Sequence, residues 1–244
     1  MSLIITIYCS EGIVMASDSR TTYYHTDTIP PMKEGSPSII IEKEGVNFTD
    51  TTYKTFLSDN GIGVSTCGAS SIEGKPIAGF IEQFLRANDK LSVKETAIKL
   101  QDFFGKKSLD KSATFIVAGY EEDENNLQQV IYRVRTTNSD IEIIDTSNQG
   151  ALWSGEVDII SRITKDLFVK TGTEEYIEYP ASPIPWNFFT LQDCIDFAEY
   201  AIKATIDTMW FQTRVKTVGG PIDILVIKPS GPQWISHKEL HTNR

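Results

Sequence analysis

The sequence is poor in cysteine, in histidine and in positive charge, and each shortage excludes a class of site or partner. Its 244 residues include three cysteines and three histidines, and 33 acidic residues outnumber 23 lysines and arginines, for a net charge of −10. Cys9, Cys67 and Cys194 are widely spaced within apolar stretches, which predicts buried, reduced thiols rather than a zinc site or a disulfide framework. The acidic balance leaves no basic stripe for a phosphate backbone, which argues against a nucleic-acid partner.

Long apolar runs are also missing. No stretch approaches the roughly 18 apolar residues of a membrane-spanning helix, and the first residues lack the basic region and small-residue cleavage site of a signal peptide. We therefore expect a cytoplasmic protein without a membrane partner. His25, His237 and His241 fall in predicted loop or tail segments, which argues against a histidine-based catalytic triad. No motif indicates a cofactor or a metal.

What the sequence does contain is an alternation of strands and helix pairs. The length favours one large domain, residues 1–244, although two small domains would also fit it. Turn residues between short apolar runs predict two strands within residues 2–20, joined at Ser10-Glu11-Gly12. Further strands are predicted at residues 38–42, 52–57, 62–67, 114–120, 129–134, 141–144, 219–227 and 233–237.

Helical periodicity and capping residues predict two pairs of helices. They are expected to begin at Gly68, at the capping box Ser92–Glu95, at Gly155 and at Thr190. The first is predicted to place Ile72, Ile77, Phe80, Ile81, Phe84 and Leu85 on one apolar face, and the third to place Val157, Ile160, Ile163 and Leu167 inward. Residues 23–35 are predicted to form a loop, and Pro180, Pro183 and Pro185 an irregular connection.

The order of these elements predicts the α+β class. Paired helices between hairpins exclude a doubly wound parallel sheet, in which one crossover helix follows each strand. Two antiparallel sheets stacked face to face, with a helix pair on each outer face, would bury every predicted apolar face. We found no internal repeat and no low-complexity segment.

Ser2 precedes the first predicted strand and is a candidate nucleophile. A free α-amine titrates at about 7.7–8.0, close to the optimum for a general base at neutral pH. After loss of Met1, Ser2 would carry both this amine and a hydroxyl, so it could act as nucleophile and as its own base. A Met-Ser start ahead of a strand also occurs in proteins without such chemistry.

Four further segments carry information through the order in which they follow one another along the chain. They are Ala16-Ser17-Asp18-Ser19-Arg20, Tyr53-Lys54-Thr55-Phe56-Leu57, the stretch 62–69 that leads into a helix, and Trp153-Ser154-Gly155 before another helix. Together they resemble the proteasome subunit family and, within it, the divergent bacterial Anbu type. The resemblance implies the four-layer αββα sandwich of amino-terminal-nucleophile hydrolases, a peptide or unfolded-protein substrate, and a homo-oligomer built as a ring or ring-like assembly.

The resemblance also implies site residues, carried over by position: Ser2, Asp18, Lys54, Gly68, Ser154 and Gly155. A buried Lys54 would stabilise the developing alkoxide of Ser2 and lower the pKa of the neighbouring amine, while Asp18 would hold the lysine in place. Gly68 would let its backbone amide approach a substrate carbonyl as an oxyanion donor. Ser154 would bind the free amine.

Each residue also has a structural explanation that the sequence leaves open. Asp18 could pair with Arg20 at a strand end, and Lys54 could lie exposed on an edge strand. Gly68 could simply permit a turn, and Ser154 could cap the helix that follows.

Two functions therefore remain open at this level. One is a peptidase that forms an acyl-enzyme on Ser2. The other is a structural or regulatory subunit without activity. Catalytic members of the family usually have a threonine nucleophile, and an aspartate and a serine ahead of a Gly-Gly pair. This chain has Val215 and Val218 ahead of Gly219-Gly220, which favours the second function.

Overall fold

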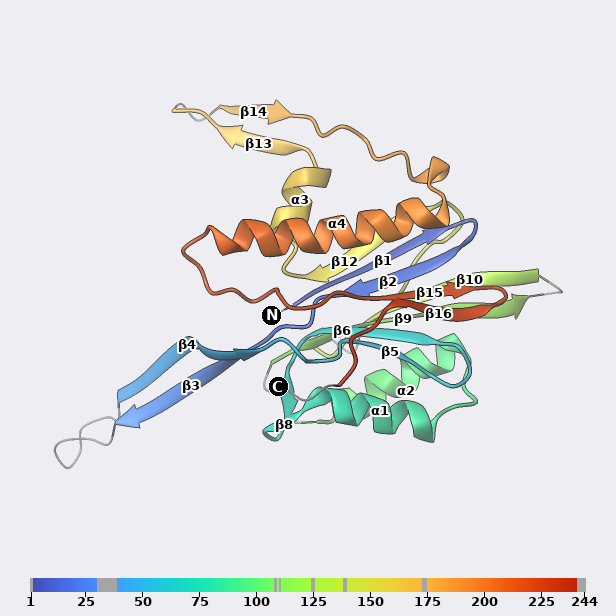
Figure 1. Cartoon of the computed structure of the whole chain (residues 1–244), viewed down its shortest axis with the longest axis horizontal. Helices are drawn as coiled ribbons and strands as arrows, with labels where there is room; N and C mark the ends of the chain where they lie inside the picture. The colour runs from blue at the N-terminus through green and yellow to red at the C-terminus, as the bar shows by residue number, and fades with distance from the viewer. Residues whose placement is uncertain are drawn as a thin grey trace.

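The computed structural model describes residues 2–29, 39–107, 109, 111–123, 126–137, 140–172 and 175–240. Over these residues the chain is a mixed α/β protein with four α-helices, and its sheets are antiparallel (Figure 1). One five-stranded sheet has the order β12-β1-β2-β15-β16, and the other has the order β11-β10-β9-β6-β5. The prediction of two antiparallel sheets is confirmed.

The strands of the first sheet are β1 (Leu3–Cys9), β2 (Gly12–Ser17), β12 (Gly150–Gly155), β15 (Asp223–Lys228) and β16 (Gly231–Ser236). Those of the second sheet are β5 (Thr55–Leu57), β6 (Gly63–Gly68), β9 (Ala113–Asp123), β10 (Asn126–Arg135) and β11 (Asp140–Ile143). Three two-stranded sheets pair β3 (Thr21–Ile29) with β4 (Ile39–Thr49), β7 (Ser71–Ile72) with β8 (Lys75–Pro76), and β13 (Leu167–Lys170) with β14 (Tyr176–Tyr179).

The helices are α1 (Ile77–Ala87), α2 (Val93–Gly105), α3 (Asp158–Thr164) and α4 (Leu191–Trp210), with a 3-10 turn, η1 (Trp186–Phe188), ahead of α4. The predicted capping box of α2 is present, because the Ser92 side chain accepts from the Glu95 amide and the Glu95 side chain accepts from the Ser92 amide. Thr190 and Asp193 form the same reciprocal cap on α4.

Within the described part of the chain, three hydrophobic clusters hold these elements together. One lies between α1–α2 and the second sheet and includes Ile81, Leu100 and Phe115. Another lies between α3–α4 and the first sheet. The third contains side chains from both five-stranded sheets. In Figure 1, α3 and α4 accordingly lie on one side of the large sheets and α1 and α2 on the other.

The strand β1 contributes to two of these clusters because both of its faces are covered. Leu3, Ile5 and Ile7 face the α4 cluster, whereas Ile4 and Tyr8 face the cluster between the sheets. All seven residues of β1 are buried. This explains why the strand is apolar at nearly every position, with Thr6 as the exception, rather than alternating between apolar and polar residues.

Two predictions in the first third of the chain are wrong, the loop at 23–35 and the helix start at Gly68. The predicted loop 23–35 is a strand as far as residue 29, since β3 pairs with β4, and its residues 30–35 lie outside the described residues. The threonines and tyrosines of β3 have high strand propensity, which its polar character obscured. The helix expected at Gly68 begins only at Ile77, because the β7–β8 turn comes first and brings Ile72 into the core from a strand.

The region around the third helix also differs from the prediction. Gly155 has φ 101°, a left-handed conformation, and ends β12 instead of opening a helix. The helix α3 spans only seven residues. Leu167, predicted to point inward, lies in the unpredicted hairpin β13–β14 and is 39% exposed. The strand β12 was not predicted either. None of the described helices is long and apolar enough to cross a membrane.

Candidate active site

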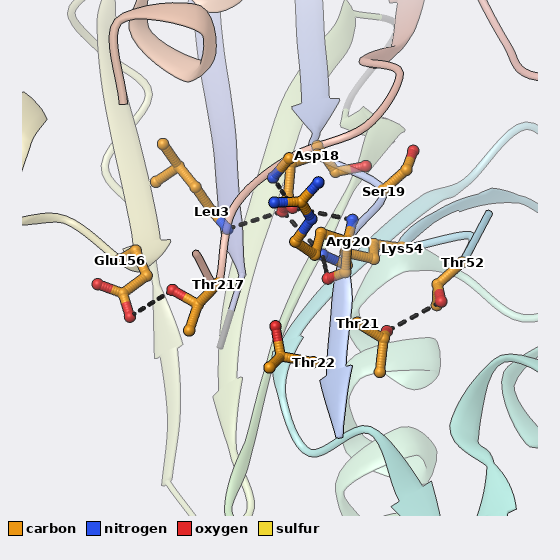
Figure 2. A network of polar contacts seen from close by, with 12 residues as sticks. Leu3, Asp18, Ser19, Arg20, Thr21, Thr22, Thr52, Lys54, Glu156 and Thr217 are labelled. Carbon is orange, nitrogen blue, oxygen red and sulfur yellow. Dashed lines mark hydrogen bonds and ion pairs between the residues drawn. The ribbon is translucent and has the colours of Figure 1, made fainter. Parts of the chain in front are cut away.

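Asp18 follows the last residue of β2 and is completely buried. Its Oδ1 accepts from the Leu3 amide at 3.0 Å and from Lys54 Nζ at 2.8 Å. Its Oδ2 accepts from the amides of Arg20 and Gly219, each at 3.0 Å. Figure 2 shows this carboxylate at the meeting point of three segments that are far apart in sequence. Four charge-assisted bonds offset the cost of burying the charge.

Lys54 immediately precedes β5 and is 3% exposed, so it is not an edge-strand lysine in water. Its ammonium donates to Asp18 and, at 2.6 Å, to the Arg20 carbonyl oxygen. Burial lowers the pKa of Lys54, and the charge and hydrogen bond of Asp18 oppose that shift. An ammonium has three N–H donors, and acceptors among the described residues account for two of them.

Ser2 and Lys54 line one narrow pocket together with Thr66, Cys67 and Gly68. Its volume is about 20 Å³, room for about one water molecule. The hydroxyl of Thr66 is buried in this pocket and finds no hydrogen-bond partner within the described part of the chain. Buried hydroxyls normally have a partner, so this one is free to bond a ligand or a water.

Cys67 is the other reactive group in the pocket. Burial raises its pKa to about 12, against the opposing charge of Lys54. A thiol with that pKa is protonated near neutral pH and is therefore a poor nucleophile. Cys9, Cys67 and Cys194 are all buried with free thiols, which confirms the prediction that they are buried.

The backbone of Ser2 is held against the end of β12. Its carbonyl oxygen accepts from the Glu156 amide at 2.8 Å. A Cβ on Gly155 would lie 1.7 Å from that carbonyl oxygen, so no other residue fits there. Ser154 lies opposite Ile4 in the β1–β12 pairing, outside the lining of the pocket. It is not a helix cap either, because Val157 is the residue ahead of α3.

Gly68 ends β6 beside the pocket and has φ 96°. A Cβ at this position would lie 2.2 Å from the carbonyl oxygen of Ser112, which also accepts from the Ala69 amide at 3.1 Å. The glycine is therefore required by the backbone alone. Its place in the lining is compatible with a role toward a ligand as well.

Arg20 pairs with Asp50 and not with the side chain of Asp18, so the suggested strand-end pair is wrong. Its Nε and Nη2 each donate to an Asp50 carboxylate oxygen at 2.7 Å, and its guanidinium lies 4.2 Å from the centre of the Phe48 ring. A Cβ on Gly219 would lie 2.5 Å from Arg20 Cζ. The Gly219–Gly220 pair thus leaves room for this bidentate ion pair.

A second polar network lies at the segment where Val215 and Val218 replace the expected acid and serine. Thr217 Oγ1 donates to Glu156 Oε1 at 2.9 Å (Figure 2), and Arg214 Nη1 lies 3.5 Å from Glu156 Oε2. Glu156 is also the residue whose amide holds the Ser2 carbonyl. Neither Glu156 nor Thr217 belongs to a motif, so only the folded chain reveals that they support Ser2.

Of the six predicted site residues, the structure brings Ser2, Lys54 and Gly68 into the lining of one pocket. It places Asp18 and Gly155 directly behind that lining and leaves Ser154 in the sheet. Thr66 was not among the predicted site residues, although it lies in the segment 62–69 that contributes to the family resemblance. Among the described residues, no cluster of three or more histidine, cysteine, aspartate or glutamate side chains could hold a metal ion.

No family model and no curated protein sequence matches the chain. Solved structures do. An Anbu mutant described as Gly-1, from Hyphomicrobium sp. strain MC1, is 12% identical with a TM-score of 0.56 over 97% of this chain and 88% of its own. Anbu, described as an ancestral beta-subunit, from Yersinia bercovieri, is 14% identical with a TM-score of 0.50 over 96% of this chain and 87% of its own. The chain therefore has the fold of Anbu proteins, as the order of its sequence segments predicts.

Proposed function

We propose that this chain is a proteasome-like peptidase subunit whose nucleophile is Ser2, freed at its amine by removal of Met1. The proposal includes the finer architecture, a four-layer αββα sandwich. The observation that carries it is the pocket shared by Ser2 and a buried Lys54, with Asp18 fixed behind the lysine by three backbone amides. The Anbu-like fold supports the same assignment.

In the proposed reaction the Ser2 hydroxyl attacks a peptide carbonyl carbon. The α-amine of Ser2 takes the hydroxyl proton and passes it to the leaving amine, so that the peptide bond breaks and an ester to Ser2 Oγ remains. Water, deprotonated by the same amine, then hydrolyses the ester. The free N–H of Lys54 stabilises the developing alkoxide, and the backbone amide of Gly68 is the proposed oxyanion donor.

A subunit without activity is the second candidate, and one observation favours it. A pocket of about 20 Å³ is far smaller than a peptide side chain requires. The peptidase proposal therefore requires the lining residues to move apart when substrate binds.

A peptide epoxyketone tests the proposal, because this reagent closes a ring with an adjacent hydroxyl and amine and so needs both groups of Ser2. Protein whose intact mass shows Ser2 as the first residue is incubated with it and digested with trypsin. We expect the adduct on the peptide that ends at Arg20. Fragmentation distinguishes Ser2 from Cys9, which lies in the same peptide.

Two control proteins accompany the test, the Ser2→Ala variant and protein that retains Met1. Neither should form the ring, since each lacks one of the two groups. If verified Ser2 protein forms no adduct and hydrolyses no peptide from a mixed library, the inactive subunit is the correct assignment. The cytoplasmic location, the ring-like assembly and the peptide or unfolded-protein substrate remain proposals that follow from the same resemblance.

A further inference from the structure

One polar group in the lining of the Ser2 pocket takes no part in the proposed reaction. Thr66 is 2% exposed, and its Oγ1 is buried without a hydrogen-bond partner among the described residues. The Thr66 amide donates to the Lys54 carbonyl oxygen at 2.8 Å, which fixes Thr66 next to Lys54 on the neighbouring segment. The unused hydroxyl therefore has a fixed position in the pocket.

Other hydroxyls in the same lining are already paired within the chain. Thr21 Oγ1 donates to Thr52 Oγ1 at 2.9 Å, and Tyr53 Oη donates to the Lys238 carbonyl oxygen at 3.0 Å. A buried hydroxyl without a partner is unfavourable, so such groups in native proteins normally find one. The difference between Thr66 and its neighbours points to a partner for Thr66 that lies outside the chain.

The size and charge of the pocket limit what that partner can be. A space of about 20 Å³ holds about one small group, so the partner group must lie close to a peptide backbone. Lys54 is already paired with Asp18, and Lys111 at the rim is exposed. A charged side chain would be buried there without a counter-ion of its own, at a large cost. A short, neutral side chain with a hydroxyl fits both limits, because a hydroxyl can donate to Thr66 and accept from it.

We propose that Thr66 selects substrates with serine at the residue that supplies the attacked carbonyl, which we call the acyl residue. This inference rests on the proposed peptidase function. The side chain of the acyl residue starts one atom away from the carbonyl carbon that Ser2 attacks, so it enters the pocket that Ser2 shares with Thr66. A site that hydrogen-bonds a substrate hydroxyl strongly rejects an analogue without it, because the buried group of the site is then left unpaired.

Two fluorogenic peptides that differ only in the acyl residue test this selection. One carries serine, and the other carries 2-aminobutyrate, whose ethyl group has nearly the same shape but no hydroxyl. Protein with a verified Ser2 amino terminus should cleave the serine peptide with a kcat/KM about 10–100-fold higher. Thr66→Val keeps the shape of threonine and removes the hydroxyl, so it should bring this ratio to one or below.

Thr52→Val is the matched control, because it removes a lining hydroxyl that is already paired. Its preference for serine should stay within a few-fold of the wild-type ratio, whatever its absolute rate. Equal cleavage of both peptides, faster cleavage of a third peptide with aspartate, or equal slowing of both by Thr66→Val would each overturn the selection and leave the peptidase function standing. Cleavage of neither peptide by protein that forms the epoxyketone adduct would also overturn it. Protein that forms no adduct and cleaves no peptide overturns the peptidase proposal, and the selection with it.

Discussion

Among the described residues, two lysine–aspartate pairs have a fully buried carboxylate, and the surroundings of these pairs differ. Asp18 accepts from Lys54 and from three backbone amides that belong to different segments. Asp223, at the start of β15, accepts from both the ammonium and the amide of a single residue, Lys238. Both carboxylates are fully buried. The first pair therefore joins distant parts of the chain, whereas the second fixes only the segment that follows β16.

The two lysines also differ in what they face. Lys54 lines the pocket that contains Ser2. Lys238 covers Tyr53, with its Nζ 4.4 Å from the ring centre, and its carbonyl oxygen accepts from Tyr53 Oη at 3.0 Å. Burial and pairing are common to both, so they do not mark a reactive lysine by themselves. Access to a candidate nucleophile is the distinguishing feature.

The largest expected difference is in reactivity. Lys54→Met should slow epoxyketone addition to Ser2 by about 10²–10³-fold, because it removes the cation that stabilises the alkoxide. Lys238→Met, the matched change in the second pair, should leave the rate within a few-fold of wild type. The rates are measured by intact mass over time, on variants whose folding is checked by circular dichroism. Equal slowing by both variants would show that Lys54 acts only through stability.

The second difference is in stability. Asp18→Asn leaves the Lys54 ammonium buried and uncompensated, so the free energy of unfolding should fall by about 3–5 kcal/mol. Asp223→Asn should cost about 1–2 kcal/mol, because Lys238 is only partly buried and can reach water. Urea unfolding followed by fluorescence measures both values. A larger loss for Asp223→Asn would reverse the ranking of the two pairs.

A third change displaces Ser2 without touching either pair. Gly155→Ala should slow epoxyketone addition by about 10²-fold, because the new Cβ pushes against the Ser2 carbonyl and moves the hydroxyl. Gly74 also has a positive φ, but a Cβ there meets nothing within 4 Å. Gly74→Ala therefore introduces similar backbone strain without the collision, and its rate should match the wild type.

The smallest effect is on the pH dependence. Burial lowers the pKa of Lys54 from its ordinary value of 10.5, and the charge of Lys238 lowers it further. The addition rate should therefore fall on the alkaline side at a pH below 10.5, as Lys54 loses its proton. Lys238→Met should move that fall to higher pH, because it removes a like charge that lowers the pKa of Lys54. If the addition rate of Lys238→Met falls at the same alkaline pH as that of the wild type, the two lysines do not interact.

The same shift has a consequence for stability. Between the lowered pKa of folded Lys54 and the ordinary pKa of the unfolded chain, the unfolded state binds more protons. The contribution of this lysine to stability therefore rises with pH through that window.

Patterns local in sequence predicted much of the fold. The capping box at Ser92 and the capping residue Thr190 correctly located α2 and α4, and the apolar runs located β1, β2, β6 and β15. The strand β12 was not predicted because it is short, ends in glycine and is a strand only through its pairing with β1. The hairpin β13–β14 was not predicted because its apolar residues also fit the spacing of a helix. Periodicity over so short a run does not distinguish a strand from a helix.

The candidate site was predictable only at residues whose type and position match a motif of the resembled family. A lysine and an aspartate in motifs of the family could be singled out, and the structure places Lys54 and Asp18 in contact. Glu156 and Thr217 contribute to the site through a hydrogen bond between residues 61 positions apart in sequence. No local sequence pattern indicates such a contact. The role expected for Ser154 rests on the family resemblance, whereas the structure places Ser154 opposite Ile4 in the β1–β12 pairing, outside the lining of the pocket.

The placement of β1 has one more consequence, for motion. Chain ends usually fray and exchange their amide hydrogens quickly. Here residues 3–9 are flanked by β12 on one side and β2 on the other, and none of their side chains is open to solvent. Their amides should be among the slowest to take up deuterium, opening only when the whole domain unfolds. The strand β1 would thus be among the most persistent of the described strands.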